Sequence, residues 1–131
     1  HASNQQQMDK LMIFNNDKAI YIQIADRLCD EIIAGTYGED SRIPSVREYA
    51  MLLQVNTNTA VKAYDELARK GIIYNKRGIG YFVSSGARAH IADMRRTDFM
   101  ERTLPTIFHD MRLLGIGIDE VTKAWKESRE S

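Results

Sequence analysis

This sequence has little cysteine and no long apolar run. Cys29 is its single cysteine, so the chain cannot form an intramolecular disulfide. No apolar run approaches the roughly 20 residues that a membrane-spanning helix needs. We therefore expect no membrane partner, and we expect the protein to reside in a reducing cytoplasm.

Net charge is also absent. Lysine and arginine together number 18 and aspartate and glutamate together number 18, so the formal net charge is zero. A large excess of positive charge would have indicated a polyanionic partner such as a nucleic acid. Because there is no such excess, a nucleic-acid-binding function would have to depend on local charge.

The sequence lacks the residue spacings that mark common catalytic and metal sites. His90 and His109, with acids such as Asp93, Asp98 and Asp110 nearby, do not follow a ligand spacing such as His-Glu-x-x-His. No nucleophile motif, phosphate loop or dinucleotide fingerprint is present. Isolated charges on an amphipathic helix usually form its solvated face. We expect a protein that is not an enzyme and that carries no metal and no cofactor.

The residues that are present are those of a folded protein of modest size. The 131 residues are 44% hydrophobic and 27% charged, which is typical of a globular chain with one domain and an appended element. Small residues at Ser84–Gly86 separate a strand-like run from a long helical pattern. We predict a mobile N-terminus over residues 1–10, a domain over residues 11–86 and an α-helical region over residues 87–131.

The first part of this domain has two helical signals. Apolar residues one turn apart predict a helix over residues 19–34 that ends at Gly35. Ser45 and Glu48 have the spacing of a capping box. A second helix is therefore predicted to begin after Ser45 and to end near Leu53.

A third helix and a hairpin follow. Asn56 can cap a helix that ends at Gly71, and strands over residues 72–74 and 81–83 flank a basic, glycine-bearing turn over residues 75–80. This order is typical of a winged helix-turn-helix, in which the second helix of the pair enters the DNA major groove. Three-helix units with a hairpin also serve as protein-interaction modules, so the pattern by itself leaves both functions open.

The pattern of the C-terminal region predicts a long helix followed by a short one. The first covers residues 87–114 and should kink or restart at Pro105, and Asp119 is a candidate cap for the last helix, which we expect to fold back on the preceding one. One apolar stripe consists of Leu104, Ile107, Phe108, Met111 and Leu114.

A tail of this size cannot bury both of its faces, which favours a two-fold homodimer with that stripe at the interface. The alternative is that the tail packs on its own N-terminal domain. The tail leaves little volume for a ligand pocket, which argues against direct sensing of a small molecule. A site at the dimer junction is the alternative, and the small-molecule effector is unknown.

The predicted fold is mainly α with a small β-hairpin, an α+β arrangement with an N-terminal winged helix-turn-helix and a short helical tail. Five segments in order resemble the GntR family of bacterial transcription regulators: Ala19–Ile24, Arg42–Glu48, Asn56–Leu67, Gly71–Ile73 and Arg77–Val83. The Asn-Thr-Asn-Thr run and the tail of about 45 residues are most similar to the YtrA subfamily. The resemblance implies a repressor that binds a palindromic double-stranded DNA operator as a homodimer.

Chemistry and resemblance together indicate the DNA-binding residues. A guanidinium at Arg47 lies near the positive end of a helix and can clamp a phosphate or reach a guanine. Asn58 and Lys62 occupy the part of a recognition helix that meets base edges and phosphates. The full predicted set is Ser45, Arg47, Thr57, Asn58, Thr59, Lys62, Lys76, Arg77, Gly78 and Gly80.

Each of these assignments has a structural alternative. Arg47 could form a surface ion pair with Glu48, Thr57 and Asn58 could serve only as helix caps, and the basic turn could be an ordinary β-turn with solvated charges. Between Lys62 and Gly80, however, five basic residues stand against two acids. A local basic surface is therefore compatible with a neutral protein.

The sequence departs from the family pattern at three positions. The family often has arginine where Thr57 stands, and some relatives carry a basic residue at the site of Val61, so the base preference of relatives cannot be transferred. Gln54 stands where the family usually has glycine. A left-handed backbone there would cost about 1 to 2 kcal/mol.

Overall fold

A computed structural model describes residues 18–129 of the chain. The N-terminal segment predicted to be mobile, residues 1–10, lies outside them. The chain forms two compact units that divide after Ile91, within helix α5 (Ala87–Asp98). Each unit is described by itself.

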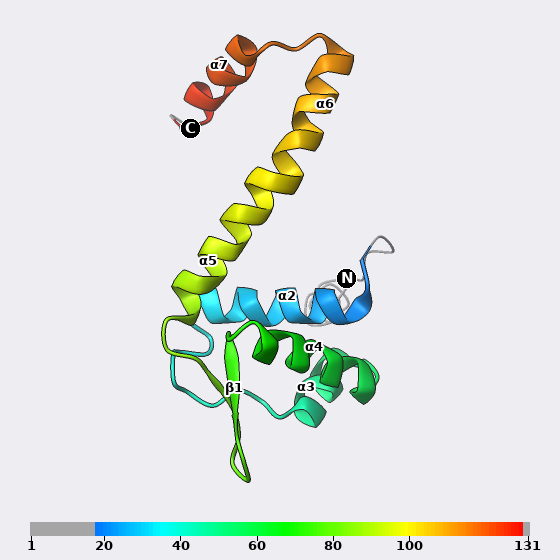
Figure 1. Ribbon diagram of the computed structural model, residues 1–131, viewed down its shortest axis with the longest axis vertical. Helices are drawn as coiled ribbons and strands as arrows, with labels where there is room; N and C mark the ends of the chain where they lie inside the picture. The colour runs from blue at the N-terminus through cyan, green and yellow to red at the C-terminus, as the bar shows by residue number, and fades with distance from the viewer. Residues whose placement is uncertain (1–17, 130–131) are drawn as a thin grey trace, which may run out of the picture. The chain divides into compact units, whose positions relative to one another are not determined.

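Between residues 18 and 91, the first unit contains three complete helices, the start of α5 and a two-stranded antiparallel sheet. The helices are α2 (Ile20–Ile33), α3 (Val46–Leu53) and α4 (Thr57–Arg69), and the strands are β1 (Ile73–Lys76) and β2 (Gly80–Val83). Helix α4 packs against both α2 and α3, and the hairpin extends away from the helices (Figure 1). The predicted mainly α fold with a small hairpin is confirmed.

The core of this unit comes from one face of each helix. Ile24, Leu28 and Ile32 recur one turn apart on α2 and have no exposed surface, because residues four apart lie on the same side of a helix. Fully burying such a side chain contributes about 1.5 to 3 kcal/mol. The other helices and the strands supply Tyr49, Leu53, Ala60, Ala63, Tyr64, Leu67, Ile73 and Val83.

Side-chain caps fix where α3 and α4 begin. The Ser45 hydroxyl accepts the Glu48 amide at 3.1 Å, and the Glu48 carboxylate accepts the Ser45 amide at 3.0 Å. The Asn56 side chain accepts the Asn58 amide at 2.8 Å. These bonds satisfy amides that a helix N-terminus leaves free, and they confirm the predicted capping box and cap.

The turn between α3 and α4 has a left-handed residue at its start. Gln54 has φ +55° and ψ +50°, and the following amide, that of Val55, donates to the carbonyl of Ala50 at 3.0 Å. Glycine is the usual residue in such a helix end because it has no Cβ. The Gln54 side chain is exposed, so the helix end retains a non-glycine residue without a steric clash in the core.

The hairpin is longer than the sequence pattern predicts. Tyr74 pairs with Phe82 and Lys76 pairs with Gly80, so each strand runs one or two residues further toward the turn. The Ile79 amide donates to the Lys76 carbonyl at 2.9 Å, and Gly78 has φ +79°. A positive φ at the third position of a four-residue turn requires glycine or a similarly permissive residue.

A third segment lies along the free edge of β2. The amide of Ile43 donates to the Tyr81 carbonyl at 3.0 Å, and the amide of Val83 donates to the Ser41 carbonyl at 3.0 Å. Between them, Arg42 forms an antiparallel bridge with Phe82. The lead-in to α3 is therefore joined to the hairpin by backbone hydrogen bonds.

Tyrosines connect the helices with the hairpin. The Tyr64 ring on α4 lies 6.0 Å from Tyr49 on α3 and meets Tyr81 on β2 edge-on at 5.1 Å. The Tyr64 hydroxyl donates to the Pro44 carbonyl at 2.6 Å, and the Tyr49 hydroxyl bonds the Glu31 carboxylate. Burial raises the pKa of both phenols well above the usual value, so they remain neutral donors. Tyr64, with no exposed surface, is therefore a core residue.

The second unit continues α5 through a π-helical turn η1 (Phe99–Thr103) into α6 (Leu104–Leu114), and α7 (Ile118–Arg129) follows. Pro105 lies in the first turn of α6. Proline has no amide hydrogen and its ring clashes with the carbonyl four residues earlier, which accounts for the widened turn just before it. The predicted interruption at Pro105 is confirmed.

The last helix differs from the prediction at its start. Asp119 is the second residue of α7 and not its cap, because the helix begins one residue earlier, at Ile118. An acid in the first turn still interacts favourably with the helix dipole. The chain reverses direction before α7 (Figure 1), but no described residue of α6 or α7 is buried. Among residues 18–129, no helix combines the length and apolar character needed to cross a bilayer.

Candidate nucleic-acid interface

The N-terminal half of α4 presents polar side chains to solvent. Thr57, Asn58, Val61 and Lys62 are exposed, and Thr59 is half-buried. The opposite face of the helix, which includes Tyr64, is buried against α2 and α3. Because the buried face fixes the rotation of the helix, Asn58 and Lys62 are held on its accessible side, one turn apart.

The helix cap leaves these side chains available. Asn56 provides the cap through its own side chain. In the described part of the chain, the Thr57 and Asn58 side chains take part in no hydrogen bond. Capping therefore does not occupy these two side chains. Within residues 18–129, no hydrogen bond supports the alternative that they act only as caps.

At the start of α3, Ser45 and Glu48 are hydrogen-bonded to each other, and Arg47 takes no part in these bonds. The Glu48 carboxylate accepts the Ser45 amide, and this hydrogen bond is the main cause of a Glu48 pKa below its ordinary value. Arg47 is exposed, and within residues 18–129 it has no ion pair, with Glu48 or any other acid. The guanidinium is thus available beside the positive end of α3.

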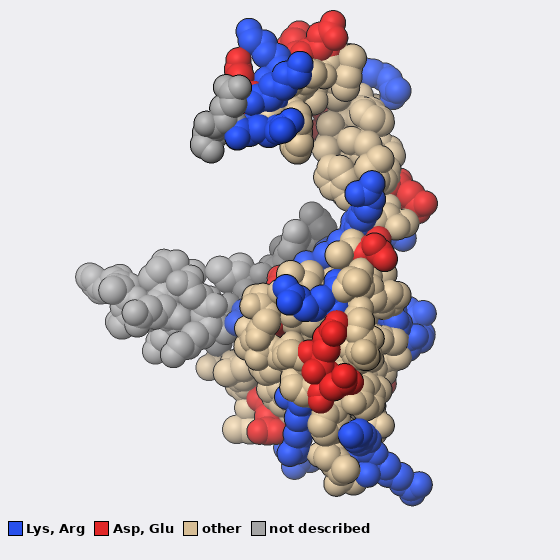
Figure 2. Space-filling model, turned by 90° about the vertical axis from the view of Figure 1, so that its left-hand side faces the viewer, with Lys and Arg blue, Asp and Glu red and all other residues tan. Residues whose placement is uncertain are grey.

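The hairpin turn carries two exposed cations. The Lys76 ammonium lies 4.7 Å from the centre of the Phe82 ring, which itself stacks on Tyr74, so the long lysine stem is held along the sheet by a cation–π contact. Arg77 and Gly78 are exposed at the turn. Figure 2 shows Lys and Arg atoms at the end of the first unit where the hairpin turn lies.

The two glycines of the turn differ in what surrounds them. A Cβ added to Gly78 would meet nothing within 4 Å. A Cβ added to Gly80, which has φ +139°, would lie 3.0 Å from Nε of Arg42. The space beside Gly80 is therefore filled by an arginine from the edge segment.

The basic residues of this region are not equivalent. Arg69 donates to the Glu66 carboxylate through Nε at 2.8 Å, and this pairing neutralises its charge. Lys62, Lys76 and Arg77 form no ion pair within the described part of the chain. Arg42 and Lys70 are also exposed and form no ion pair there, so the local positive charge comes from these two residues together with Arg47, Lys62 and the hairpin turn.

Comparison with known proteins identifies the first unit. The sequence profile of a family described as bacterial regulatory proteins, gntR family, matches residues 20–83. The HTH-type transcriptional repressor YtrA of Bacillus subtilis (strain 168) is 32% identical over 108 residues, which cover 82% of each chain. The chain belongs to the GntR family. The predicted GntR and YtrA-like relationship is thereby confirmed.

Solved structures of GntR proteins agree with this result. A putative GntR-family regulator from Bacteroides thetaiotaomicron is 46% identical, with a TM-score of 0.75 over 86% of this chain and 100% of that chain. The DNA-binding domain of AraR, solved in complex with the operator ORX1, is 26% identical, with a TM-score of 0.50 over 56% of this chain and 96% of that chain. The family and its members are regulators, so the chain is not an enzyme.

The residues considered for a metal site do not come together in this GntR protein. His90 Nε2 lies 2.8 Å from the Lys70 carbonyl oxygen and forms a hydrogen bond there. Nowhere between residues 18 and 129 do three or more His, Cys, Asp or Glu side chains form a group that could hold a metal ion.

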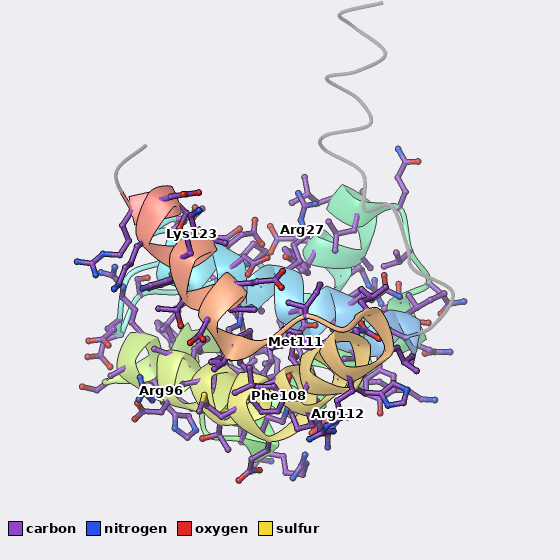
Figure 3. The ribbon with its side chains drawn as sticks, turned by 90° about the horizontal axis from the view of Figure 1, so that it is seen from above. Arg27, Arg96, Phe108, Met111, Arg112 and Lys123 are labelled. Carbon is purple, nitrogen blue, oxygen red and sulfur yellow. The ribbon has the colours of Figure 1, made fainter. Side chains whose placement is uncertain are left out.

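The apolar stripe of the second unit is accessible. The stripe residues Leu104 and Met111 are partly buried, Ile107 and Phe108 are each 38% exposed and Leu114 is 71% exposed. Figure 3 labels Phe108 and Met111 on α6. Additional exposed apolar residues that the stripe did not include are Phe99, Met100, Leu113, Ile118, Val121 and Trp125.

Two residues near the turn were missed by the sequence prediction. Ile79 is 56% exposed at the turn itself, and Arg42 lies against Gly80. The only sequence signal was the position of Arg42 immediately before the Ile43-Pro44-Ser45 segment. Its contact with the hairpin follows from the pairing with Phe82, which the sequence pattern did not predict.

Proposed function

We propose that this GntR-family chain is a sequence-specific transcriptional repressor that binds a palindromic operator as a homodimer. The observation that carries the proposal is that Ser45, Glu48 and Asn56 form the caps of α3 and α4. Arg47, Asn58 and Lys62 are left exposed and unpaired. Side chains of these types are the ones that contact phosphates and base edges.

The proposed roles follow from the chemistry of each group. The Asn58 amide can donate to and accept from adenine, and the Lys62 ammonium suits guanine or a phosphate. Thr57 and Thr59 carry hydroxyls near the helix N-terminus, and Ser45 contributes by holding Arg47 at the start of α3.

The hairpin is proposed to clamp the DNA backbone. Lys76 and Arg77 supply positive charge at the turn, and the open space at Gly78 lets the backbone approach a phosphate closely. The AraR domain in complex with operator DNA, which resembles this fold, supports this use of the unit. A regulator of transcription acts where the chromosome is, so we expect the protein in the cytoplasm.

The homodimer is proposed from the accessible apolar residues of the tail. No described residue of α6 or α7 is buried, and large apolar side chains left in water favour association. A two-fold dimer through Leu104, Ile107, Phe108, Met111 and Leu114 would cover the α6 stripe with an identical one. Two copies of α4 would then read two half-sites related by the same axis.

Selection of duplexes from a random pool by the full chain tests this function. We expect enrichment of a two-fold symmetric sequence whose half-sites are about one helical turn, or a multiple of it, apart. Arg47→Ala should weaken binding to the selected duplex, whereas Arg88→Ala, which removes the same charge from α5, should not. Failure to enrich any sequence at moderate salt would contradict the proposal and favour a protein-interaction module.

A further inference from the structure

Arg42 is the edge residue that joins the start of α3 to the hairpin. Its bridge to Phe82 is flanked by the backbone bonds of Ile43 and Ser41 with β2. Residues opposite each other in an antiparallel pair direct their side chains to the same face of a sheet. Arg42 therefore shares a face with Phe82 and with Tyr74, the partner of Phe82 on β1.

The Arg42 side chain runs toward the turn. Its backbone is level with Phe82, but its guanidinium lies beside Gly80, which is two residues nearer the turn. A Cβ at Gly80 would lie 3.0 Å from Nε and 3.4 Å from Nη2 of Arg42. Glycine at this position therefore provides the space in which the guanidinium rests.

The charge of Arg42 is not neutralised by an ion pair with another described residue. Arg42 is exposed, and in the described part of the chain it forms no ion pair. The carboxylate whose pKa it lowers, that of Glu48, is already bonded to the Ser45 amide. The guanidinium thus lies between the start of α3 and the hairpin turn with donors still available.

We propose that Arg42 is a further DNA-contacting residue, which binds a backbone phosphate of the duplex and which Gly80 positions for this contact. This inference rests on the proposed DNA-binding function. The guanidinium fork suits a phosphate because two of its N–H groups can bond two oxygens of one anion. A phosphate contact adds affinity and fixes register, but it reads no base.

Salt titration of duplex binding provides the test. The probe is a fluorescein-labelled duplex selected by the wild-type chain, and fluorescence anisotropy gives the dissociation constant across a range of salt concentrations. Loss of one phosphate contact reduces the slope of log K against log salt by about one unit. Arg42→Ala should show this reduction and bind about tenfold more weakly, as loss of a charged hydrogen bond would produce.

Two further variants separate the charge from its placement. Arg42→Lys keeps the charge and should keep the slope, while losing affinity because lysine has no fork. Gly80→Ala should weaken binding with Arg42 intact, and adding it to Arg42→Ala should cause less further loss than it causes alone. Far-UV circular dichroism verifies folding, and if Gly80→Ala does not fold, the Arg42 variants decide the question.

The matched control is Arg88→Ala, which should leave both the slope and the affinity unchanged. Equal slopes and affinities for wild type and Arg42→Ala, with Arg47→Ala weakened, would overturn the role of Arg42 and leave the proposed function intact. If the wild-type chain selects no duplex, the proposed function itself fails. A loss of affinity in Arg42→Ala without a change of slope would also overturn the phosphate contact.

Discussion

Replacing Gln54 with glycine should stabilise the protein. Gln54 holds a left-handed conformation, with φ +55°, at the end of α3, and that conformation costs an L-residue about 1 to 2 kcal/mol. Glycine removes this cost but adds about 0.5 to 1 kcal/mol of backbone entropy to the unfolded chain. Because the side chain is exposed, no packing is lost, and the net gain should be about 0.5 to 1 kcal/mol.

Urea and thermal unfolding of wild type and Gln54→Gly at one protein concentration measure this gain. A gain of this size corresponds to a rise in melting temperature of about 2 to 8 °C for a unit of this length. The slope of the unfolding free energy against urea should not change, since the same surface is exposed on unfolding. Holding the concentration fixed matters because self-association shifts the apparent stability.

Two control variants isolate the backbone effect. Gln54→Ala keeps a Cβ in the left-handed conformation and should give no gain. Asp40→Gly relieves the other non-glycine residue with positive φ in the described chain, at φ +62°, but aspartate tolerates this region better, so its gain should be smaller. If Gln54→Gly were no more stable than Gln54→Ala, the left-handed cost at this turn would be refuted.

Three further predictions concern the caps, the tyrosine contacts and the tail. The hydrogen bond from the Ser45 amide holds the Glu48 pKa below its ordinary 4.5. Glu48 therefore stabilises the fold at pH values above 4.5, and this stabilisation is lost as the pH falls through the lower folded-state pKa. Glu48→Gln should lose less unfolding free energy than wild type over this acid range, and an equal loss in both proteins would contradict the prediction. Tyr64→Phe removes the donor to the Pro44 carbonyl and should cost about 1 to 2 kcal/mol in urea unfolding, whereas an unchanged midpoint would mean that this bond contributes nothing. Phe108→Asp introduces a charge into the accessible apolar stripe and should give a monomer by light scattering, with His109→Asp as the charge control; a dimer in both variants would exclude the stripe as the interface.

Local patterns predicted most of the fold. The one-turn spacing of Ile24, Leu28 and Ile32 indicates a buried helix face directly, because that spacing follows from 3.6 residues per turn. The capping box at Ser45 and Glu48 was readable for a similar reason, since its partners lie within a single turn. Strand ends were less accurate, because the extension of the strands to Lys76 and Gly80 depends on hydrogen bonds across the hairpin.

The predicted start of the last helix was wrong for a comparable reason. Asp119 is a good cap by residue type, but the helix already begins at Ile118. Residue preference for a cap is weak compared with the backbone geometry of the preceding turn, which here contains Gly115 in a left-handed conformation. A cap at Asp119 would start the helix at Glu120, so the prediction is wrong by two residues because it used the preference without that geometry.

The sequence by itself determined the order of helices and hairpin and the caps of α3 and α4, because these features depend on residues within one or two turns of each other. Tertiary structure decided that the Tyr64 hydroxyl donates to the Pro44 carbonyl, and that the guanidinium of Arg42 rests beside Gly80. The second of these arises from the pairing of residues 40 positions apart in the chain. Contacts across such a separation depend on how the elements pack, which no local spacing specifies.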